Sequence, residues 1–375
     1  MTGSARSDKG DRGSSLFVGL MSGTSLDGID AVLAEIGEHG TQVRAHARQA
    51  FQDDLRAELL ALCVPADNEI DRAGLAGNRL ARLYASATQE LLKAAGVAPR
   101  AVRAIGCHGQ TVRHRPERGY TLQIGNPALL AELTAITVVA DFRSRDVAAG
   151  GQGAPLVPAF HATVFGSPDE DRAVLNLGGI ANATLLARDG AVRGFDTGPG
   201  NCLLDLWIQR VLDQRFDARG AWAAGAAPDP RLLERLLDEP FFAQAPPKSS
   251  GRELFNAAWL ERRIDSALPP QVVQASLLEL TARSASDAIL EQAPSAARVI
   301  VCGGGTRNDA LLSRLAALLA PRPVETSDAW GLDAEQVEAA AFAWLADRAL
   351  AGKPASLPGV TGARAARVLG AIYPV

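Results

Sequence analysis

A glycine- and hydroxyl-rich turn near the N-terminus is the first stretch of this chain that is suited to chemistry. Gly23, Thr24, Ser25 and Gly28 separate two apolar runs within residues 16–33. Glycines allow close backbone approach, the hydroxyls add donors, and the flanking apolar residues favour β-strands. Backbone N–H groups gathered in such a turn form a concavity that binds anions. The stretch predicts a β-hairpin that holds a phosphate, with an ordinary hairpin turn as the alternative.

A second stretch repeats this plan in the other half of the chain. Residues 173–186 contain an apolar run, the turn Asn176-Leu-Gly-Gly-Ile-Ala-Asn182 and another apolar run. The sequence has no G-x-x-x-x-G-K-[ST] segment and no G-x-G-x-x-G segment after a first strand, so neither usual nucleotide motif is present. The faint internal duplication favours two glycine-rich hairpins that face each other across a cleft and hold one polyphosphate.

Three consecutive glycines, Gly303, Gly304 and Gly305, follow an apolar run and precede a helical pattern. Bare backbone at this place suits a flat ring, so the segment predicts a platform for an adenosine, with Asn308 as a cap of the following helix. A tight strand-to-helix turn is the alternative.

Asp196 is the candidate general base. It ends a predicted strand and is followed by Thr-Gly-Pro-Gly-Asn201, a context without a competing positive side chain. A carboxylate so placed is suited to accept a proton from a hydroxyl or from water. The alternative is that Asp196 only caps the helix that begins near Cys202, although its context exceeds what capping requires.

Polar side chains also follow the strands of the first half, where open α/β sheets place their site residues. They are His108, Gln110, Thr111, Asn126, Asp141, Arg143, Arg145 and Asp146. Such groups hydrogen-bond sugar hydroxyls or a carboxylate, and His108 is either a base or a hydrogen-bonded core histidine, the second being favoured. Lys248 and Glu338 either reach the substrate or are simply solvated. The residues expected to contact substrate are His108, Gln110, Thr111, Asp141, Arg145, Lys248 and Glu338.

The elements that position these residues alternate between strands and helices. Apolar residues recur at helical spacing over residues 53–95, 272–291 and 334–351, and residues 221–260 are expected to be irregular. The length of 375 residues suits two domains with a site between them. We expect a disordered tail over residues 1–15, a first domain of residues 16–145 with about 353–375, and a second domain of residues 146–352.

Composition narrows the class of protein. The chain is 47% hydrophobic and 21% charged with a net charge of −4, so it gives no general reason to expect a nucleic acid or an anionic membrane as partner. The four cysteines are widely spaced, which indicates reduced residues of a cytoplasmic protein. The histidines lack the spacing of a zinc site, and no apolar run is long enough for a membrane span.

Taken together, these motifs resemble the anhydro-N-acetylmuramic acid kinase family, a branch of the actin, hexokinase and heat-shock ATPase superfold. The blocks that carry the resemblance stand in the family's order over nearly the whole chain. They are Gly19-Leu-Met-Ser-Gly-Thr-Ser-Leu-Asp-Gly-Ile-Asp30, Ile105-Gly-Cys-His-Gly-Gln-Thr111, Asp141-Phe-Arg-Ser-Arg-Asp146, Gly150-Gly-Gln-Gly-Ala-Pro-Leu-Val-Pro-Ala-Phe-His161, Asn176-Leu-Gly-Gly-Ile-Ala-Asn182, Asp196-Thr-Gly-Pro-Gly-Asn201 and Cys302-Gly-Gly-Gly-Thr-Arg-Asn308. The resemblance implies an α/β fold of two actin-like (ribonuclease H-like) domains, each a mixed five-stranded sheet with flanking helices, and an ATP cleft between them.

The resemblance also implies a reaction. Such enzymes convert 1,6-anhydro-N-acetylmuramic acid, ATP and water into N-acetylmuramic acid 6-phosphate and ADP in cell-wall recycling, with Mg²⁺ expected at the phosphates. By the family pattern Asp196 deprotonates the water, and the released O6 attacks the γ-phosphate. The expected ATP-binding residues are Gly23, Thr24, Ser25, Leu26, Asp27, Gly28, Ile29, Asp30, Asn176, Gly178, Gly179, Gly303, Gly304, Gly305 and Asn308. The family further suggests a homodimer.

One departure concerns the metal. Hairpins of the wider superfold usually open with D-x-G, whereas here Met21-Ser-Gly23 stands in that place, so no direct metal ligand is predicted. Two other functions stay open on the residues alone: a sugar kinase that acts on an ordinary hydroxyl, and an ATP-binding module of the chaperone or filament type without metabolic chemistry.

Overall fold

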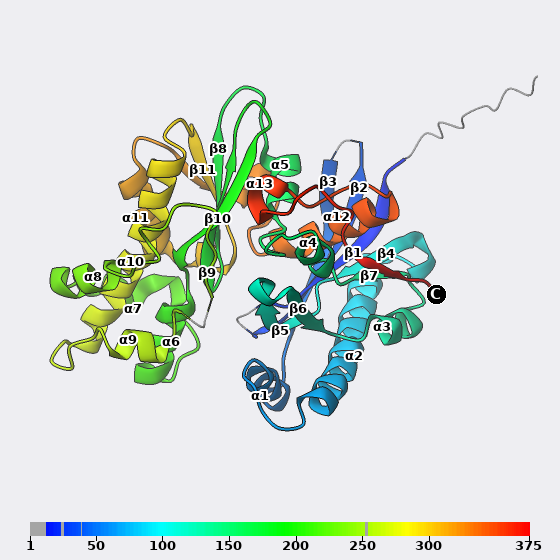
Figure 1. Cartoon of the computed structure of the whole chain (residues 1–375), viewed down its shortest axis with the longest axis horizontal. Coiled ribbons are helices and arrows are strands. Elements are labelled where there is room, and N and C mark those ends of the chain that lie inside the picture. The colour runs from blue at the N-terminus through cyan, green and yellow to red at the C-terminus, as the bar shows by residue number, and fades with distance from the viewer. Residues whose placement is uncertain (1–12, 24–25, 39, 252–253) are drawn as a thin grey trace, which may run out of the picture.

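The computed structural model describes residues 13–23, 26–38, 40–251 and 254–375, and it has two lobes, each built around one β-sheet (Figure 1). This arrangement confirms the expected α/β class with two sheet-centred units. Most of the predicted N-terminal tail, residues 1–12, lies outside the described residues, and the first strand already begins at Ser15.

The first sheet has the strand order β13-β7-β4-β1-β2-β3. Its strands are β1 (Ser15–Met21), β2 (Gly28–Gly37), β3 (Gly40–Ala50), β4 (Val102–Cys107), β7 (Val138–Ala140) and β13 (Ala371–Tyr373). The first three form an antiparallel meander, and β4 and β7 add in parallel. The prediction of five strands was wrong for this sheet, because the C-terminal strand β13 pairs with the edge strand β7 and makes a sixth.

The second sheet has the five strands expected, in the order β10-β9-β8-β11-β12. They are β8 (Arg172–Leu177), β9 (Ile180–Leu186), β10 (Val192–Pro199), β11 (Arg298–Cys302) and β12 (Val324–Thr326). An antiparallel meander is again followed by two parallel strands, so the sheet repeats the first one without β13. The internal duplication predicted from the two hairpins is therefore confirmed. A separate hairpin, β5 (Gln110–Arg115) and β6 (Tyr120–Ile124), belongs to the first lobe.

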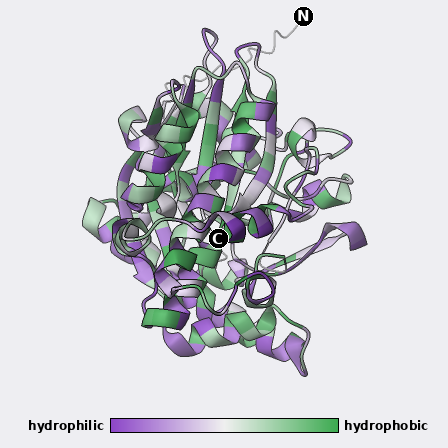
Figure 2. Cartoon of the chain, turned by 90° about the vertical axis from the view of Figure 1, so that its left-hand side faces the viewer, coloured by the Kyte–Doolittle hydropathy of each residue, from purple (hydrophilic) through white to green (hydrophobic). Residues whose placement is uncertain are grey.

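The helices lie on the faces of the two sheets. In the first lobe they are α1 (Asp53–Leu62), α2 (Glu69–Ala95), α3 (Pro127–Thr134) and α4 (Ser144–Ala148). The others are α5 (Pro158–Phe165), α6 (Cys202–Leu212), α7 (Ala221–Ala224), α8 (Pro230–Leu237), α9 (Ala257–Glu261), α10 (Pro270–Gln292), α11 (Asp309–Leu319), α12 (Val337–Leu350) and α13 (Pro358–Thr361). Short 3₁₀ turns are η1 (Pro99–Ala101), η2 (Pro116–Arg118), η3 (Ala218–Gly220), η4 (Gly304–Arg307) and η5 (Ser327–Trp330). Figure 2 views the lobe of α10 face on and shows hydrophobic and hydrophilic residues interspersed along its helices.

The expectation that residues 221–260 are irregular was wrong, because three short helices, α7, α8 and α9, fall there. Pro230 stands in the first turn of α8, and Asp229 caps it by accepting the Leu232 N–H. Asn256 caps α9 in the same way. Each helix is too short for the helical periodicity on which longer segments were recognised.

Strand β1 is buried on both faces and therefore consists of a nearly continuous apolar run. Val18 and Leu20 pack with α2 on one side, and Phe17 packs with α12 on the other. Helix α12 lies directly on the sheet, because a Cβ atom at Gly19 or at Gly106 would overlap a carbonyl oxygen of that helix. Its own residues are buried almost all round, which is the pattern of a central helix.

The core around α12 joins the two lobes. One cluster of buried side chains contains Phe17 of the first sheet, Val174 and Ile300 of the second, and Phe342 of α12. The expected limit of the second domain at residue 352 would assign α12 to that domain, whereas the helix packs on the first sheet. The domain limits at 145 and 352 stay predictions, and a shared core lies between the two sheets.

Within the described parts of the chain, no helix combines the length and the hydropathy needed to cross a bilayer.

Candidate active site

The turn between β1 and β2 brings the first glycine-rich hairpin to the end of the first sheet. The Gly23 carbonyl oxygen accepts the Leu26 N–H at 3.3 Å and the Gln110 Nε2 at 3.3 Å. Leu26 is buried with a φ of 58°, and Asp27 is exposed. The predicted phosphate contacts Thr24 and Ser25 lie outside the described residues. The predicted contacts Gly28 and Ile29 are buried in β2.

Ser22 anchors this turn to the first lobe. Its hydroxyl lies 2.7 Å from the Tyr84 hydroxyl and donates to the Gly109 carbonyl oxygen at 3.1 Å. Its carbonyl oxygen lies 3.2 Å from His108 Nδ1. Ser22 stands within the Met21-Ser-Gly segment that replaces the usual D-x-G, and its hydrogen bonds make it a structural support of the loop.

The second hairpin turn is braced by the segment that follows Asp196. The Gly178 carbonyl oxygen accepts the Asn201 N–H at 2.8 Å, and the Gly179 carbonyl oxygen accepts the N–H groups of Gly200 and Cys202, both at 3.0 Å. Two predicted motifs, the Asn176 turn and the Asp196-Thr-Gly-Pro-Gly-Asn201 turn, therefore form one unit at the end of the second sheet.

The triple glycine lies against this unit. Gly303 has a φ of 86°, and a Cβ atom there would overlap the side-chain oxygen of Asn176, so a larger residue does not fit. Gly305 lies against Leu177, whereas a Cβ at Gly304 would meet open space. Asn308 caps α11 by accepting the Leu311 N–H at 3.0 Å, as predicted. The side-chain oxygen of Asn308 is thus engaged in capping α11.

Glu338 on α12 lies where the two hairpins meet. Asn176 Nδ2 donates to its carboxylate at 3.5 Å. Burial and then the negative charge of Asp30 raise the pKa of Glu338, while Arg143 and Asn176 oppose the change. Asp30 belongs to the first hairpin and Asn176 to the second. Glu338 therefore marks the point at which the two repeats approach each other.

Asp30 has one carboxylate oxygen that is buried and without a hydrogen-bond partner among the described residues. This oxygen lies 3.5 Å from His46 Nε2 and 3.7 Å from Arg48 Nε, both on β3. Among the residues that the structure describes, no group of three His, Cys, Asp or Glu side chains gathers as a ready metal site.

Arg143 is held against His108. Its Nε and Nη2 atoms lie 3.2 and 3.0 Å from His108 Nε2, and its Nη1 donates to the Gly153 carbonyl oxygen at 2.7 Å. A guanidinium only donates, so His108 Nε2 is the acceptor and its Nδ1 carries the proton that is donated to Ser22. Burial and the neighbouring Arg143 lower the pKa of His108 to about 3, which keeps the imidazole neutral. His108 is therefore a hydrogen-bonded core histidine, the alternative favoured from the sequence.

Asp196 stands on β10, at a register shift in its pairing with β9. Its backbone N–H donates to the Lys248 carbonyl oxygen at 3.0 Å, and its Oδ2 accepts the Ser250 N–H at 2.8 Å. The carboxylate is only partly buried. The irregular loop before α9 thus fixes the candidate base from the side.

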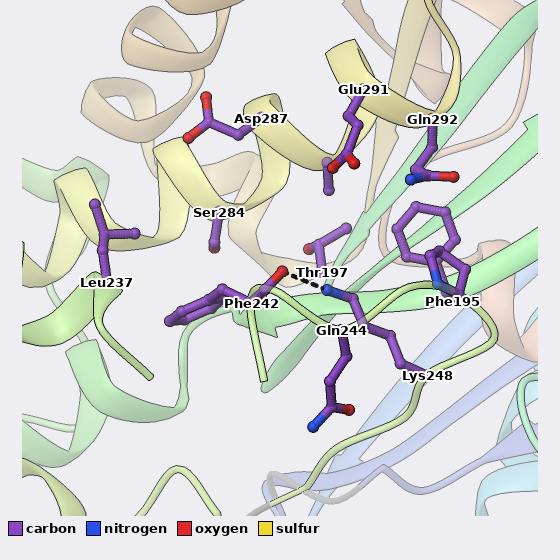
Figure 3. A pocket seen from close by; sticks show the side chains of 12 residues that line it. Phe195, Thr197, Leu237, Phe242, Gln244, Lys248, Ser284, Asp287, Glu291 and Gln292 are labelled. Atoms are coloured by element: carbon purple, nitrogen blue, oxygen red, sulfur yellow. Dashed lines mark hydrogen bonds between the residues drawn. The ribbon is translucent and has the colours of Figure 1, made fainter. Parts of the chain in front are cut away.

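The Lys248 side chain is bonded to its own loop. Its ammonium donates to the carbonyl oxygens of Phe241 and Phe242, at 3.1 and 3.0 Å, in a small pocket between β10 and α10 (Figure 3). Burial lowers the pKa of Lys248, against the attraction of Glu291 and Asp196. The predicted substrate contact of Lys248 stays a prediction, and the structure shows this side chain in use as a clamp of its own loop.

The other predicted substrate residues are spread along the first lobe. Gln110 is buried, and Thr111 accepts a hydrogen bond from Gln123. Asp141 is exposed and accepts the Ser144 N–H, and Arg145 is exposed on α4. Arg143, two residues before Arg145, is the arginine that is bonded to His108 and attracted electrostatically to Glu338. The sequence places both arginines after the same strand. Only the packing of α4 shows which of them contacts His108.

The family model and the curated relatives agree with each other. Residues 15–375 match the family model described as anhydro-N-acetylmuramic acid kinase. Relatives of that name include a Bordetella petrii protein, 58% identical over 96% of both chains, and a Pseudomonas putida protein, 54% identical over 96% of this chain and 99% of the relative. Among solved structures, component A of (R)-2-hydroxyglutaryl-CoA dehydratase from Acidaminococcus fermentans matches with a TM-score of 0.47 and 11% identity, over 88% of this chain and 98% of that chain.

Proposed function

The chain belongs to the anhydro-N-acetylmuramic acid kinase family, and we propose that its reaction takes place where the two glycine-rich hairpins meet, with Asp196 as the general base. As a member of the family it is an ATP-dependent kinase of 1,6-anhydro-N-acetylmuramic acid and acts in peptidoglycan recycling. The observation that carries the proposed site is the approach of Asp30, Asn176 and Glu338, because it joins both predicted phosphate loops at one place.

In the proposed reaction two bonds between heavy atoms break and two form. Asp196 takes a proton from a water molecule, the water oxygen attacks the anomeric carbon, and the bond from that carbon to O6 breaks. The released O6 attacks the γ-phosphorus and ADP leaves, so anhydro-sugar, ATP and water give the 6-phosphate, ADP and a proton. The Ser250 N–H on Asp196 Oδ2 fixes the orientation of the carboxylate, and orientation is a large part of general-base efficiency.

Arg143 supplies the fixed positive charge of the site. It is clamped by His108 and Gly153 and lies near Glu338. Burial lowers the pKa of Arg143 to about 10, against the attraction of Glu338 and Asp146, so the guanidinium remains charged at neutral pH. We assign to it the stabilisation of negative charge on the phosphoryl group during transfer, the usual task of an arginine in such sites.

Asp30 and Glu338 would hold Mg²⁺ together with the phosphates. The buried Oδ1 of Asp30 accepts no hydrogen bond from the described residues, although His46 and Arg48 lie within ion-pair distance of it. This oxygen and the carboxylate of Glu338 are hard oxygen ligands, and Mg²⁺ commonly takes one or two carboxylates while phosphates and waters complete its shell. A protein cage of three ligands is not required. When bound, the ion neutralises phosphate charge during transfer.

The cellular setting follows the family pattern. We propose a homodimer in the cytoplasm, and the four cysteines, all without disulfides, are in keeping with a reducing compartment. Light scattering coupled to size exclusion tests the dimer, and a mass of about 39.2 kDa would contradict it.

The decisive test traces the oxygen atom of water into the product. The protein is incubated with ATP and anhydro-N-acetylmuramic acid in ¹⁸O-water, and label at C1 of the phosphorylated sugar is expected. A parallel sample of unlabelled N-acetylmuramic acid 6-phosphate in the same water, without protein, corrects for spontaneous exchange at that carbon.

Two outcomes contradict the proposal. Phosphorylation of N-acetylmuramic acid at a rate equal to or above that of the anhydro-sugar would indicate a kinase acting on an ordinary hydroxyl. Nucleotide binding without turnover of either sugar would indicate a non-metabolic ATP-binding module.

A further inference from the structure

The glycine-rich segment 148–153 is held along its length by the C-terminal part of the chain. The Gln152 N–H donates to the Thr361 carbonyl oxygen at 2.7 Å, and the Arg364 N–H donates to the Ala149 carbonyl oxygen at 2.9 Å. Thr361 ends α13, which follows the central helix α12. Two segments far apart in the sequence therefore form one backbone-paired unit beside α4.

Asp146 fastens this unit from the inside. The side chain is completely buried, and both of its carboxylate oxygens are used. Oδ2 accepts the Gly153 N–H at 2.8 Å, and Oδ1 accepts the Thr361 hydroxyl at 2.8 Å. A carboxylate removed from water requires such donors, so the pairing of α4, segment 148–153 and α13 at this point is strongly specified.

Gly153 transmits this pairing to Arg143. Its N–H is bound by Asp146 and its carbonyl oxygen accepts Arg143 Nη1 at 2.7 Å, so one peptide segment connects the buried carboxylate with the guanidinium. The other side of the guanidinium is fixed by His108. Arg143 thus has two supports, one from the strand end of β4 and one from segment 148–153.

We propose that Asp146 and Thr361 are positioning residues for phosphoryl transfer, which act by fixing the Gly153 carbonyl oxygen that orients Arg143. This inference rests on the role given to Arg143 in the proposed function. It makes the C-terminal segment part of the active-site support, although its residues come after every motif that indicated the site.

Thr361→Val tests the proposal with little change of volume. The hydroxyl is lost, Asp146 loses one donor, and we expect kcat to fall about 10- to 100-fold, as when a supporting contact is lost and a reacting group is misplaced. The KM for ATP should stay near its normal value, because the hairpins are unchanged. Thr361→Ser keeps the hydroxyl and should restore most of kcat. Thr134→Val is the matched control, since it removes a buried hydroxyl bonded to a helix carbonyl in α3, away from the site.

Asp146→Asn tests the same link from the carboxylate side with little change of volume. The amide has one acceptor oxygen in place of two, so either the Gly153 N–H or the Thr361 hydroxyl loses its acceptor. We expect kcat to fall at least as far as in Thr361→Val, and the double variant to fall little further, because both changes break the same link. Independent, additive losses would contradict that link.

The possible failures are distinguishable. If Thr361→Val has the kcat of the Thr134→Val control, or if Thr361→Ser is as impaired as Thr361→Val, the positioning role is wrong while the proposed function stands. If Arg143→Ala leaves kcat unchanged, the assignment of Arg143 fails and this inference fails with it. Thermal melting of each variant shows whether a loss of kcat exceeds the loss of folded protein.

Discussion

The third strand of each meander is the place where the two repeats differ most. In the first sheet β3 alternates between exposed and partly exposed residues along its whole length, although α2 packs against it. In the second sheet β10 occupies the same position but is largely buried, because α10, α13 and α5 pack against it. The topology is duplicated, whereas the elements that cover it are not.

The two repeats also carry their acidic residue on different strands. Arg48 of β3 lies opposite Asp30 of β2, so the first repeat places its acid on the inner strand and a base on the edge. In the second repeat the acid, Asp196, is on the edge strand β10 and faces the neutral Asn182. A neighbouring arginine stabilises the charged form of a carboxylate and so weakens it as a proton acceptor, whereas a neutral amide has no such charge. This difference favours the second repeat as the place of the proposed base.

The largest expected effect is at Asp196. Asp196→Asn removes the base without changing the shape of β10, and turnover should fall by about 10² to 10⁴-fold, the range for loss of a general base. Nucleotide binding, measured by calorimetry, should be retained because the hairpins are untouched. Gln42→Ala on the exposed edge β3 is the counterpart in the first repeat and should leave turnover unchanged. Normal turnover of Asp196→Asn would contradict the assignment of the general base to β10.

The next effect concerns the sheet faces that meet the central core. The first sheet presents Gly19 and Gly106 to α12, whereas the second presents Val174 and Ile300 to the same cluster. Gly106→Ala forces α12 away from the sheet and should lower the free energy of unfolding by about 1–3 kcal/mol, as overpacking does. Ile300→Val removes one methyl group and should lower it by about 0.5–1.5 kcal/mol. Urea unfolding measures both changes.

An exposed glycine of helix α2, Gly74, provides the control for that pair. Gly74 has open space around its Cβ position, so Gly74→Ala should raise the free energy of unfolding. If Gly106→Ala were also neutral or stabilising, the close approach of α12 to the first sheet would be contradicted.

The last prediction concerns how the free energy of unfolding depends on pH through two buried histidines. Burial lowers the pKa of His108 and of His161 to about 3, from an ordinary value of 6.5. Between these limits the unfolded chain binds protons that the folded chain does not, so stability is present above pH 6.5 and falls as pH decreases toward 3. The slope is at most about 1.4 kcal/mol per pH unit for each histidine.

His161→Asn checks this expectation. His161 lies in the second lobe with Thr184 as its partner, so the change should leave the site intact and remove one histidine from the acid response. Urea titrations at pH 7.5, 6.5, 5.5 and 4.5 should show a shallower decline for the variant. Equal slopes for the variant and the unaltered protein would contradict the neutral, buried state of His161.

Local sequence was sufficient for the strands that are buried or carry a turn signal. β1, β4, β8 and β11 were predicted because apolar runs end in glycine or polar clusters, and the Asn308 cap was predicted from its place before a helix. β13 was missed because three residues at the chain end form a strand only through pairing with β7. The short helices α7, α8 and α9 were missed because periodicity needs more turns than they have.

The residues of the candidate site also fall into those predictable from local sequence and those that depend on tertiary packing. The sequence determined the two glycine-rich hairpins, the triple glycine and the carboxylate at Asp196, since these motifs depend on backbone freedom and on residue type at a strand end. Only the tertiary structure decided that Arg143 rather than Arg145 is bonded to His108, that His108 is a neutral support, and that Thr361 and Asp146 fasten segment 148–153. Such pairings join residues from distant segments, and they are fixed by how α4, α12 and α13 pack, which no local pattern records.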